Sequence, residues 1–273
     1  MKIKVNNISK SFKNNKQINE VLKDIDFEIN EGEFVCLLGP SGCGKTTLLT
    51  IIAGFKEANS GEIIVGDNVV RGPGSDRGFV FQNYALFPWM NVEKNILYPM
   101  KQQKIQKEER KIRLNELLEM SKLKGKEKLY PSQLSGGMKQ RTAVIRALAC
   151  KPKVLLLDEP LGAVDFQMRK MLQEELESIF IQDKTTAVMV THDVDEAVYM
   201  SDRVIVMSTD KGRIIKDLRI NLPRPRNREG KEYNEYKDEL TQVLIQALGY
   251  ENKKENTEEY NKETKFNFEL KNA

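Results

Sequence analysis

Residues 39–47 read Gly39-Pro40-Ser41-Gly42-Cys43-Gly44-Lys45-Thr46-Thr47, and this segment predicts the architecture of the 273-residue chain around it. It fits the pattern G-x-x-x-x-G-K-[ST], in which a glycine-rich backbone cradles the phosphates of a nucleotide. The apolar run 34–38 before it is typical of a strand buried on both faces, and residues 45–53 are typical of a helix. A strand, a loop and a helix in this order predict a nucleotide-binding α/β fold, and they disfavour a glycine turn that binds nothing.

The remaining apolar segments extend this pattern in both directions. We expect further strands at residues 3–8, 21–29, 61–65, 78–81, 154–157, 186–191 and 203–207. We expect helical segments at residues 91–120, 137–149, 166–181 and 235–248. The first two strands should form an antiparallel pair, and the later alternation of buried strands with helices predicts a parallel sheet flanked by helices.

The signals weaken toward the C-terminal end. The amphipathic helix at 166–181 is expected to bury Met168, Met171, Leu172, Leu176, Ile179 and Phe180. After residue 208 the pattern of apolar strands and helices weakens. Residues 222–226, Leu-Pro-Arg-Pro-Arg, are typical of a turn or linker, and the polar stretch 252–273 is typical of a disordered tail.

Composition limits the classes of protein that fit. The 44 basic and 40 acidic residues argue neither for nor against nucleic acid, and Cys36, Cys43 and Cys150 have no metal-ligand spacing. No apolar run approaches the roughly 18 residues of a membrane span, and residues 1–5 alternate like a strand instead of forming a signal peptide. We therefore expect a cytoplasmic protein whose membrane role, if any, comes through a partner.

A second segment, Leu134-Ser135-Gly136-Gly137-Met138-Lys139-Gln140-Arg141, follows the first in the chain. It is similar to the LSGGQ signature, which few phosphate-loop proteins other than ABC ATPases carry. With both segments in the right order, the chain resembles the ATP-binding subunit of an ABC transporter over about residues 1–225. The Met-Lys pair in this segment, where Gln-Arg or Met-Arg is common, is a mild departure from the family.

The resemblance implies the architecture of an ABC ATPase. Its fold class would be α/β: a P-loop NTPase with a parallel core sheet, an antiparallel β subdomain and an inserted helical subdomain at about residues 90–149. Residues 1–225 would form this ATPase domain. Residues 226–273 would add a C-terminal helix and a charged, flexible tail.

The resemblance also implies ATP and Mg²⁺ as ligands. The ATP-binding residues would be Phe12 and the loop residues Gly39, Pro40, Ser41, Gly42, Cys43, Gly44, Lys45, Thr46 and Thr47. Lys45 would reach the β- and γ-phosphates, and the Thr46 hydroxyl would ligate Mg²⁺. Phe12 matches the aromatic residue that stacks on adenine, although a core phenylalanine fits the sequence nearly as well.

Four polar residues that follow expected strands match the hydrolytic residues of the family. Asp158 matches the aspartate that orders the Mg²⁺ shell, and Glu159 matches the acid that polarises the attacking water. Gln82 matches a glutamine whose neutral amide contacts Mg²⁺ or that water. His192, the single histidine of the chain, matches the switch histidine that contacts the γ-phosphate and holds Glu159 in place. Taken singly, each has a plainer interpretation as a surface or structural side chain.

The signature residues Ser135, Gly136 and Gly137 place backbone N–H groups and a hydroxyl at a helix N-terminus, which suits an anion. In this family the helical subdomain projects sideways, so the signature of one subunit meets the phosphate loop of a second. A homodimer with two active sites is therefore expected. Asp165 is retained although the residues before it depart from the family, so its dimer contact is expected to persist.

Three short segments are similar to one group of importers within this family. Residues 71–82, 86–89 and 222–226 look like those of the nitrate, sulfonate and taurine import group, which implies membrane permease subunits and, indirectly, an extracytoplasmic solute-binding protein as partners. No nucleic acid is expected. The alternative, a non-transport ABC ATPase of the DNA-repair or ribosome-associated kind, usually carries a coiled-coil or zinc insertion or a second ATPase unit, and this chain has none of these patterns.

The segment 84–90, Tyr-Ala-Leu-Phe-Pro-Trp-Met, gathers aromatic residues around a proline soon after Gln82. We expect it to dock a short helix of the permease, with packing between the sheet and the helical subdomain as the alternative. Cys43 lies near a helix N-terminus, which predicts a favoured thiolate and sensitivity to thiol reagents. A packed and inert thiol is the other interpretation.

Overall fold

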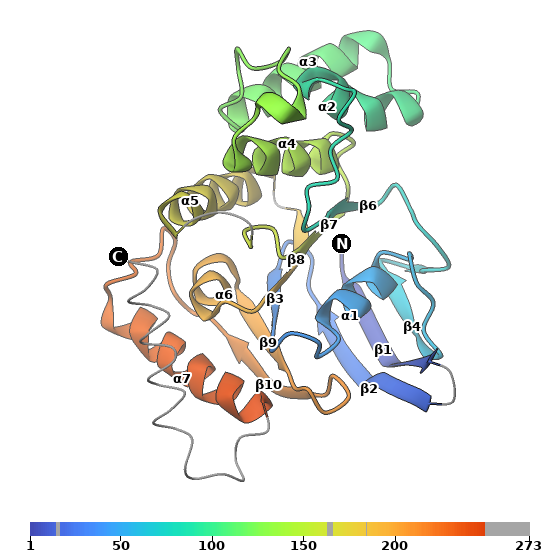
Figure 1. The fold of residues 1–273 in the computed structure, drawn as a ribbon, viewed down its shortest axis with the longest axis vertical. Coiled ribbons are helices and arrows are strands. Elements are labelled where there is room, and N and C mark those ends of the chain that lie inside the picture. Colours follow the sequence, from blue (N-terminus) through green and yellow to red (C-terminus); the bar gives the residue numbers. More distant parts are fainter. Residues whose placement is uncertain (15–16, 163–165, 184, 249–273) are drawn as a thin grey trace.

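Two β-sheets form the centre of the protein in a computed structural model that describes residues 1–14, 17–162, 166–183 and 185–248. Within these ranges, one sheet has the strand order β2-β1-β4-β5 and the other has the order β10-β9-β3-β8-β7-β6. Figure 1 shows the helices α2, α3 and α4 grouped beyond one end of the larger sheet. The expected α/β class is confirmed.

The larger sheet carries five parallel strands in its described part: β3 (Phe34–Leu38), β6 (Arg77–Val80), β7 (Val154–Asp158), β8 (Thr186–Thr191) and β9 (Arg203–Met207). Every residue of β3, β7 and β8 is buried, as predicted from their uninterrupted apolar runs. A sixth strand, β10 (Ile214–Arg219), pairs antiparallel with β9 at the edge. Its residues alternate between half-buried and exposed, so it lacks the apolar run by which the other strands were recognised.

The smaller sheet is antiparallel and lies over one face of the larger one. It consists of β1 (Ile3–Asn14), β2 (Gln17–Ile29), β4 (Ser60–Val65) and the short β5 (Asn68–Val69). Its buried aliphatic side chains share one hydrophobic cluster with α1 (Lys45–Ile52) and with one face of β3, β7, β8 and β9. The expected antiparallel pair 3–8 with 21–29 is confirmed and is longer than predicted.

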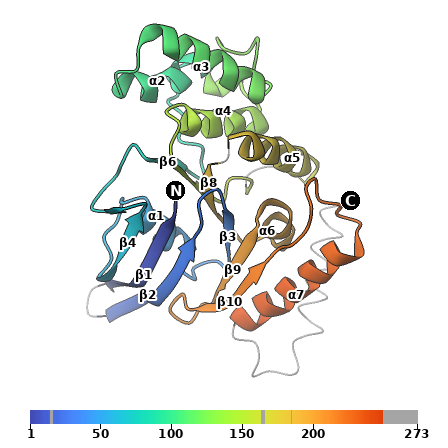
Figure 2. The ribbon, with the colours of Figure 1, turned by 180° about the vertical axis from the view of Figure 1, so that it is seen from behind.

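The region expected to be helical at 91–120 forms two helices, α2 (Val92–Gln102) and α3 (Lys107–Met120). The Asn91 side chain caps α2 by accepting the Lys94 N–H at 2.9 Å. A 3₁₀ turn (Pro131–Gln133) leads into α4 (Gly136–Leu148), which packs against α2 and against the edge of the larger sheet. These three helices are the top layer in Figures 1 and 2.

The second face of the larger sheet is covered by α5 (Phe166–Asp183), α6 (Val194–Met200) and α7 (Lys231–Ala247). Leu172, Leu176 and Phe180 of α5 are buried as predicted, but Met171 is 57% exposed, so its predicted burial is wrong. The side chains of the other two residues expected to face inward, Met168 and Ile179, lie outside the described part of the chain.

The segment 222–228 explains why α5 buries a different face from the one predicted. Gln173 and Glu177 of α5 are buried, because Arg228 donates to the first and Arg224 to the second. These polar residues widen the buried stripe on the side away from Met171. The same segment is packed against the protein and is not a free linker, since Arg226 is only 6% exposed. Within the described ranges, no helix combines the length and hydrophobicity needed to cross a membrane.

Candidate functional site

The loop between β3 and α1 has the backbone that the phosphate-loop pattern predicts. Gly42 and Gly44 adopt φ values of 82° and 102°, a region that L-residues with a Cβ avoid. A Cβ at Gly39 would lie 2.5 Å from the Met207 carbonyl oxygen. The first N–H groups of α1 have no carbonyl partner inside the helix, so they are available to an anion.

Lys45, the first residue of α1, is in a position to meet a phosphate. Its side chain is buried, and Nζ donates to the carbonyl oxygens of Gly39 at 2.7 Å and Pro40 at 2.8 Å. A buried ammonium group needs such partners. Phosphate oxygens entering the loop would offer a stronger, charged replacement for these carbonyls.

Thr46 and Asp158 bring two oxygen ligands together. The Thr46 hydroxyl of α1 donates to Asp158 Oδ1 at the end of β7, at 2.8 Å. Burial raises the pKa of the Asp158 carboxyl, while the bond from Thr46 opposes this shift. In the part of the chain that the structure describes, no three His, Cys, Asp or Glu residues gather as a metal site. The Thr46 hydroxyl and the Asp158 carboxylate fit Mg²⁺, which takes few protein oxygens and completes its shell with water and ligand phosphates.

A second group of side chains lies beside this pair, around Glu159. Gln82 Nε2 donates to Glu159 Oε2 at 3.1 Å, and His192 Nδ1 lies 3.4 Å from Glu159 Oε1. Glu159 has φ 42°, in the left-handed region, and its N–H donates to the Val190 carbonyl oxygen at 3.0 Å. Gln82 follows β6, Glu159 follows β7 and His192 follows β8, and these strands are parallel neighbours, so the three residues meet at one edge of the sheet.

Other predicted site residues lie apart from this group or outside the description. Ser135 is the N-cap of α4 and accepts the Met138 N–H at 3.3 Å, so the signature begins a helix as expected. Figure 1 places that helix in the upper layer, away from the start of α1. Phe12 is 37% exposed on β1, with the ammonium groups of Lys10 and Lys56 over its ring. Asp165 lies outside the described residues.

The favoured thiolate predicted for Cys43 is wrong. Its side chain is 1% exposed, and burial raises the pKa of the thiol although Lys45 Nζ lies 3.8 Å from its Sγ. Desolvation therefore outweighs the helix N-terminus and the neighbouring ammonium group at this position. The inert, packed thiol is the interpretation that the structure favours.

A cluster of polar residues that was not predicted from the sequence lies behind His192. Thr191, Asp193 and Glu196 are linked by hydrogen bonds, and Arg169 of α5 forms ion pairs with Asp193 and Glu196. Asp193 is the N-cap of α6, because its Oδ1 accepts the N–H groups of both Asp195 and Glu196.

A cavity of about 420 Å³ lies beside the segment 84–90. Its lining includes Phe79, Phe81, Phe87 and Tyr98, with Arg146 at its wall. Arg146 donates to the carbonyl oxygens of Tyr84 and Ala85. Arg146 therefore holds the backbone of this segment, and the cavity beside it is an aromatic groove between the sheet and the helical layer.

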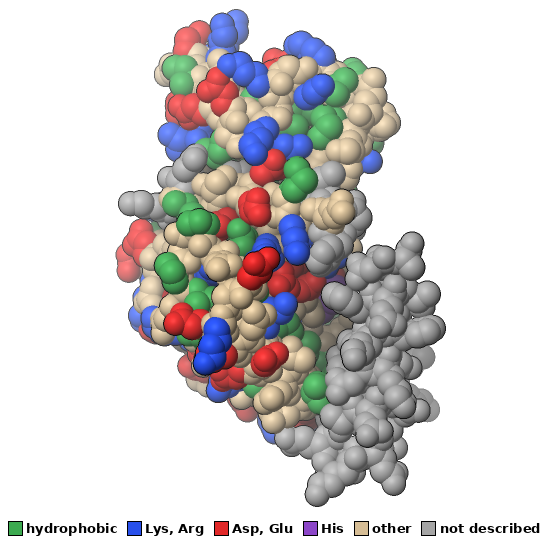
Figure 3. Space-filling model, turned by 90° about the vertical axis from the view of Figure 1, so that its left-hand side faces the viewer, with side chains coloured by type: hydrophobic (Ala, Val, Ile, Leu, Met, Phe, Trp, Pro, Cys, Tyr) green, Lys and Arg blue, Asp and Glu red, His purple; other side chains and the backbone are tan. Residues whose placement is uncertain are grey.

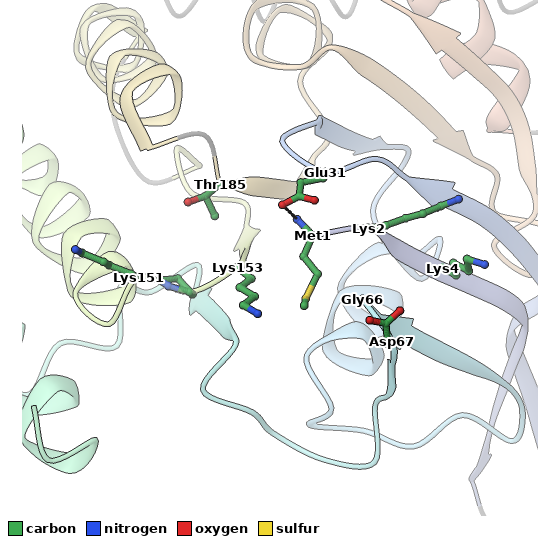
Figure 4. A pocket seen from close by; sticks show the side chains of 10 residues that line it. Met1, Lys2, Lys4, Glu31, Gly66, Asp67, Lys151, Lys153 and Thr185 are labelled. Atoms are coloured by element: carbon green, nitrogen blue, oxygen red, sulfur yellow. Dashed lines mark ion pairs between the residues drawn. The ribbon is translucent and has the colours of Figure 1, made fainter.

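A larger cavity, of about 760 Å³, lies near the chain start (Figure 4). Five cationic groups surround it, but Lys2 and Lys4 form ion pairs with Glu28, and the Met1 amine forms one with Glu31. The side chains of Lys2 and Lys151 extend away from each other (Figure 4). The cations do not converge on one point, so this cavity is not a candidate anion site.

The family model for ABC transporters matches residues 22–162. An uncharacterized ABC transporter ATP-binding protein of Methanocaldococcus jannaschii is 46% identical over 244 residues, which cover 89% of this chain and 91% of that protein. An aliphatic sulfonates import ATP-binding protein of Bacillus cereus is 43% identical over 242 residues, or 89% and 95% of the two chains. A nitrate import ATP-binding protein of Synechocystis is also 43% identical, over 253 residues and the same shares.

A solved structure points the same way. A dimeric ATP-binding cassette in a post-hydrolysis state, bound to ADP and Pi, superposes with a TM-score of 0.70 at 32% identity and covers 80% of this chain and 99% of that chain. These relatives are at least 43% identical over nearly their whole length. The structure adds a phosphate loop, a signature helix and a Gln-Glu-His group at one edge of the sheet. This chain therefore belongs to the ATP-binding ATPase subunits of the ABC transporter family.

Proposed function

We propose that this ATPase is the motor subunit of an ABC importer, in which ATP binding and hydrolysis in a dimer drive solute uptake through a membrane permease. The observation that carries the proposal is the meeting of Gln82, Glu159 and His192 beside the Thr46–Asp158 pair. That arrangement holds a carboxylate next to oxygen ligands suited to a metal–phosphate group. A water molecule between the two would be positioned for attack on the terminal phosphate.

We propose that ATP binds at residues 39–47 and Mg²⁺ at Thr46, Asp158 and Gln82. Lys45 exchanges its two loop carbonyl partners for β- and γ-phosphate oxygens, and the N–H groups of α1 support the same phosphates. Bound Mg²⁺ would neutralise charge on the phosphates. Phe12 is proposed to stack on adenine, which its partial exposure permits.

In hydrolysis, Glu159 is proposed to orient the attacking water and to hold its proton at a carboxylate oxygen. His192 keeps the Glu159 carboxylate in place from one side, while Gln82 holds it from the other. Because the Gln82 amide carries no charge and the contact is exposed, no ion pair holds Gln82 at Glu159, and it can leave this contact. Gln82 is therefore suited to report events in the neighbouring groove to the catalytic carboxylate.

We propose a homodimer in which Ser135, Gly136 and Gly137 of one subunit contact the γ-phosphate bound by the other. The dimeric ADP-bound and Pi-bound relative supports this arrangement. Asp165 would contribute to the same interface. In this scheme residues 1–225 form the ATPase domain, with the helical subdomain at about 90–149, and residues 226–273 form the C-terminal extension.

The permease is proposed to dock in the aromatic groove beside the segment 84–90. Trp89 of this segment is 68% exposed, while the backbone of the segment is held by Asn95 and Arg146. A rigid loop that exposes a large aromatic side chain is typical of an interface. The subunit would lie in the cytoplasm, at the inner face of the membrane, and an extracytoplasmic solute-binding protein would deliver the solute.

The relatives with named substrates import aliphatic sulfonates and nitrate, so we propose a small oxyanion or sulfonate as the class of solute. The alternative is a non-transport ABC ATPase. The two are distinguished by transport: vesicles that contain the subunit with its permease should accumulate solute only with ATP.

The substitution Glu159→Gln tests the catalytic assignment. It keeps the size of the side chain but removes the carboxylate, so ATP turnover should fall at least about 100-fold while ATP still binds. Gel filtration with ATP should then show a stable dimer. Unchanged turnover in this variant would remove Glu159 from its proposed role.

A further inference from the structure

A set of four polar residues surrounds the backbone on both sides of His192. Thr191 ends β8, and its hydroxyl donates to Glu196 Oε2 at 2.6 Å while it accepts the Asp193 N–H at 3.0 Å. Glu196 is 3% exposed in the first turn of α6. The residue before His192 and the residue after it are thus tied to one buried carboxylate through a single hydroxyl group.

Arg169 joins this set from a different helix. Its Nη1 lies 2.8 Å from Asp193 Oδ2, and its Nε lies 3.6 Å from Glu196 Oε1. The other oxygen of Asp193 caps α6. One guanidinium group of α5 therefore links the residue that follows His192 with the buried acid of α6.

These contacts lead to a role for residues that do not touch the nucleotide. We propose that Thr191, Asp193, Glu196 and Arg169 form a positioning cluster that fixes His192 against Glu159, and that this requires the ionised form of Glu196. The inference rests on the proposed catalytic function of His192 and Glu159. His192 itself is 55% exposed at its side chain, so its own packing cannot fix it. The order of the loop must come from its neighbours.

The electrostatic surroundings of Glu196 make its charge sensitive to pH. Burial and the negative charge of Asp193 raise its pKa to about 7, while Thr191 and Arg169 lower it and Glu159 adds a small upward effect. Cys36 of β3 also faces it, since the charge of Glu196 contributes to raising the pKa of that thiol. Glu196 is therefore about half ionised near pH 7; its charge is complete only well above that pH and is lost as the pH falls below it.

Protonation would weaken two of the contacts. A neutral carboxyl group is a poorer acceptor for the Thr191 hydroxyl and no longer attracts Arg169. Arg169 would then pair with Asp193 alone, and the loop could shift. A misplacement near 1 Å at a catalytic group costs up to about 100-fold in rate, so a partial loss of order is measurable as a lower kcat.

The test compares ATP turnover in Glu196→Gln and in Glu174→Gln, an exposed acid of α5 that serves as the matched control. We expect the first variant to lose about 10-fold in kcat at pH 8 with a change in KM of less than about two-fold. The part of the wild-type pH profile with an apparent pKa near 7 should disappear in it. An unchanged kcat and profile would overturn the proposal.

Thr191 gives a second test that does not depend on the folding of the first variant. Thr191→Val removes the hydroxyl at nearly constant volume, and Thr191→Ser keeps it. The valine variant should lose kcat as Glu196→Gln does, the serine variant should retain it, and the double variant Thr191→Val/Glu196→Gln should lose no more than either single change. Additive losses, or equal loss in the serine variant, would contradict a shared positioning role.

The outcome can be separated from a failure of the proposed function. If the wild type lacks ATPase activity, or if Glu159→Gln is fully active, the catalytic assignment fails. If Glu159→Gln is inactive while Glu196→Gln and Thr191→Val keep the wild-type kcat and pH profile, only the positioning cluster fails. Binding of a fluorescent ATP analogue by every variant confirms that the nucleotide site is folded.

Discussion

The backbone of Glu159 shows how much local geometry this site demands of one residue. With φ 42°, it adopts a conformation that costs a non-glycine residue roughly 1 kcal/mol or more. The bond from its N–H to the Val190 carbonyl oxygen and the contacts with Gln82 and His192 hold it there. A glycine would relieve the strain but would lose the carboxylate, which is consistent with an acid being kept at a strained position.

The residues of the phosphate loop could be predicted because their pattern requires specific chemistry at fixed spacing. The positioning cluster could not, since a buried glutamate and an arginine on a distant helix have no local signature. The Asp193 cap differs from the rest of the cluster, because capping involves only neighbours within three residues. Long-range polar contacts of this kind need the fold before they can be recognised.

We predict that Cys43 reacts slowly with alkylating reagents in the native protein. Burial raises the pKa of both thiols, but the Cys43 side chain is only 1% exposed, whereas Cys150 is half-buried. Iodoacetamide at pH 8 should modify Cys150 at least about 10 times faster, as measured by mass spectrometry of tryptic peptides. Iodoacetamide should inactivate the Cys43→Ser variant at least as fast as it inactivates the wild type. Faster labelling of Cys43, with loss of ATPase activity and protection by ATP, would contradict this prediction.

At the scale of elements, the aromatic groove depends on how α2 holds the segment before it. Asn95 is fully buried; its Oδ1 accepts the Phe87 N–H, and its Nδ2 donates to the carbonyl oxygens of Phe87 and Met90. This single side chain replaces the backbone pairing that an irregular segment otherwise lacks. The segment is therefore ordered without being buried, and Trp89 is left exposed.

We predict that Trp89→Ala leaves the isolated subunit intact. Because the indole is 68% exposed, its loss should change the free energy of unfolding by less than about 1 kcal/mol and should leave basal ATP hydrolysis unchanged. Co-purification with the permease and ATP-driven transport should be strongly reduced. Phe87→Ala is the informative comparison, since this ring contacts both Trp89 and Tyr98. A destabilised Trp89→Ala subunit would favour packing as the role of the segment.

Most elements were predictable, and the exceptions have a common cause. The strands β3, β7, β8 and β9 can be recognised in the sequence as apolar runs. In contrast, β10 is an edge strand whose residues alternate in exposure, and it was not predicted. The buried face of α5 was predicted wrongly at Met171. Arg228 and Arg224 form hydrogen bonds with Gln173 and Glu177, so these polar residues of α5 are buried instead. In both cases a distant partner, and not the local period, determines which side chains are buried.

At the scale of the whole molecule, the segment 222–228, which precedes α7, is held against α5 and α6 by its arginines. Arg226 donates to the carbonyl oxygens of Val198 and Tyr199 near the end of α6, and burial lowers the pKa of its guanidinium to about 10, so it remains charged at neutral pH. Arg228 lies over the ring of Tyr199 at 3.6 Å. Acidic and basic side chains are interspersed over this side of the molecule (Figure 3).

We predict that Arg226→Met destabilises the protein by about 2–3 kcal/mol, because the carbonyl groups that it serves would be buried without donors. The midpoint of thermal unfolding should fall by about 5–10 °C. Arg219→Met, a change at an exposed arginine of β10, should leave the midpoint within about 2 °C and is the control. An equal effect of the two changes would show that the buried contacts of Arg226 are not what stabilises the segment.

The strand order also has a consequence in time. β3 is made among the first forty residues, yet its neighbours in the sheet are β8 and β9, and the Phe34 N–H donates to Asp202, 168 residues later. At a synthesis rate of about 5–20 residues per second, roughly 8–34 s pass between the synthesis of β3 and that of β8 and β9, the strands that flank it. During that interval β3 has no partner in the sheet. A chain stopped before residue 186 should therefore expose β3 to chaperones or to aggregation, while one that has passed residue 207 can close the sheet around it.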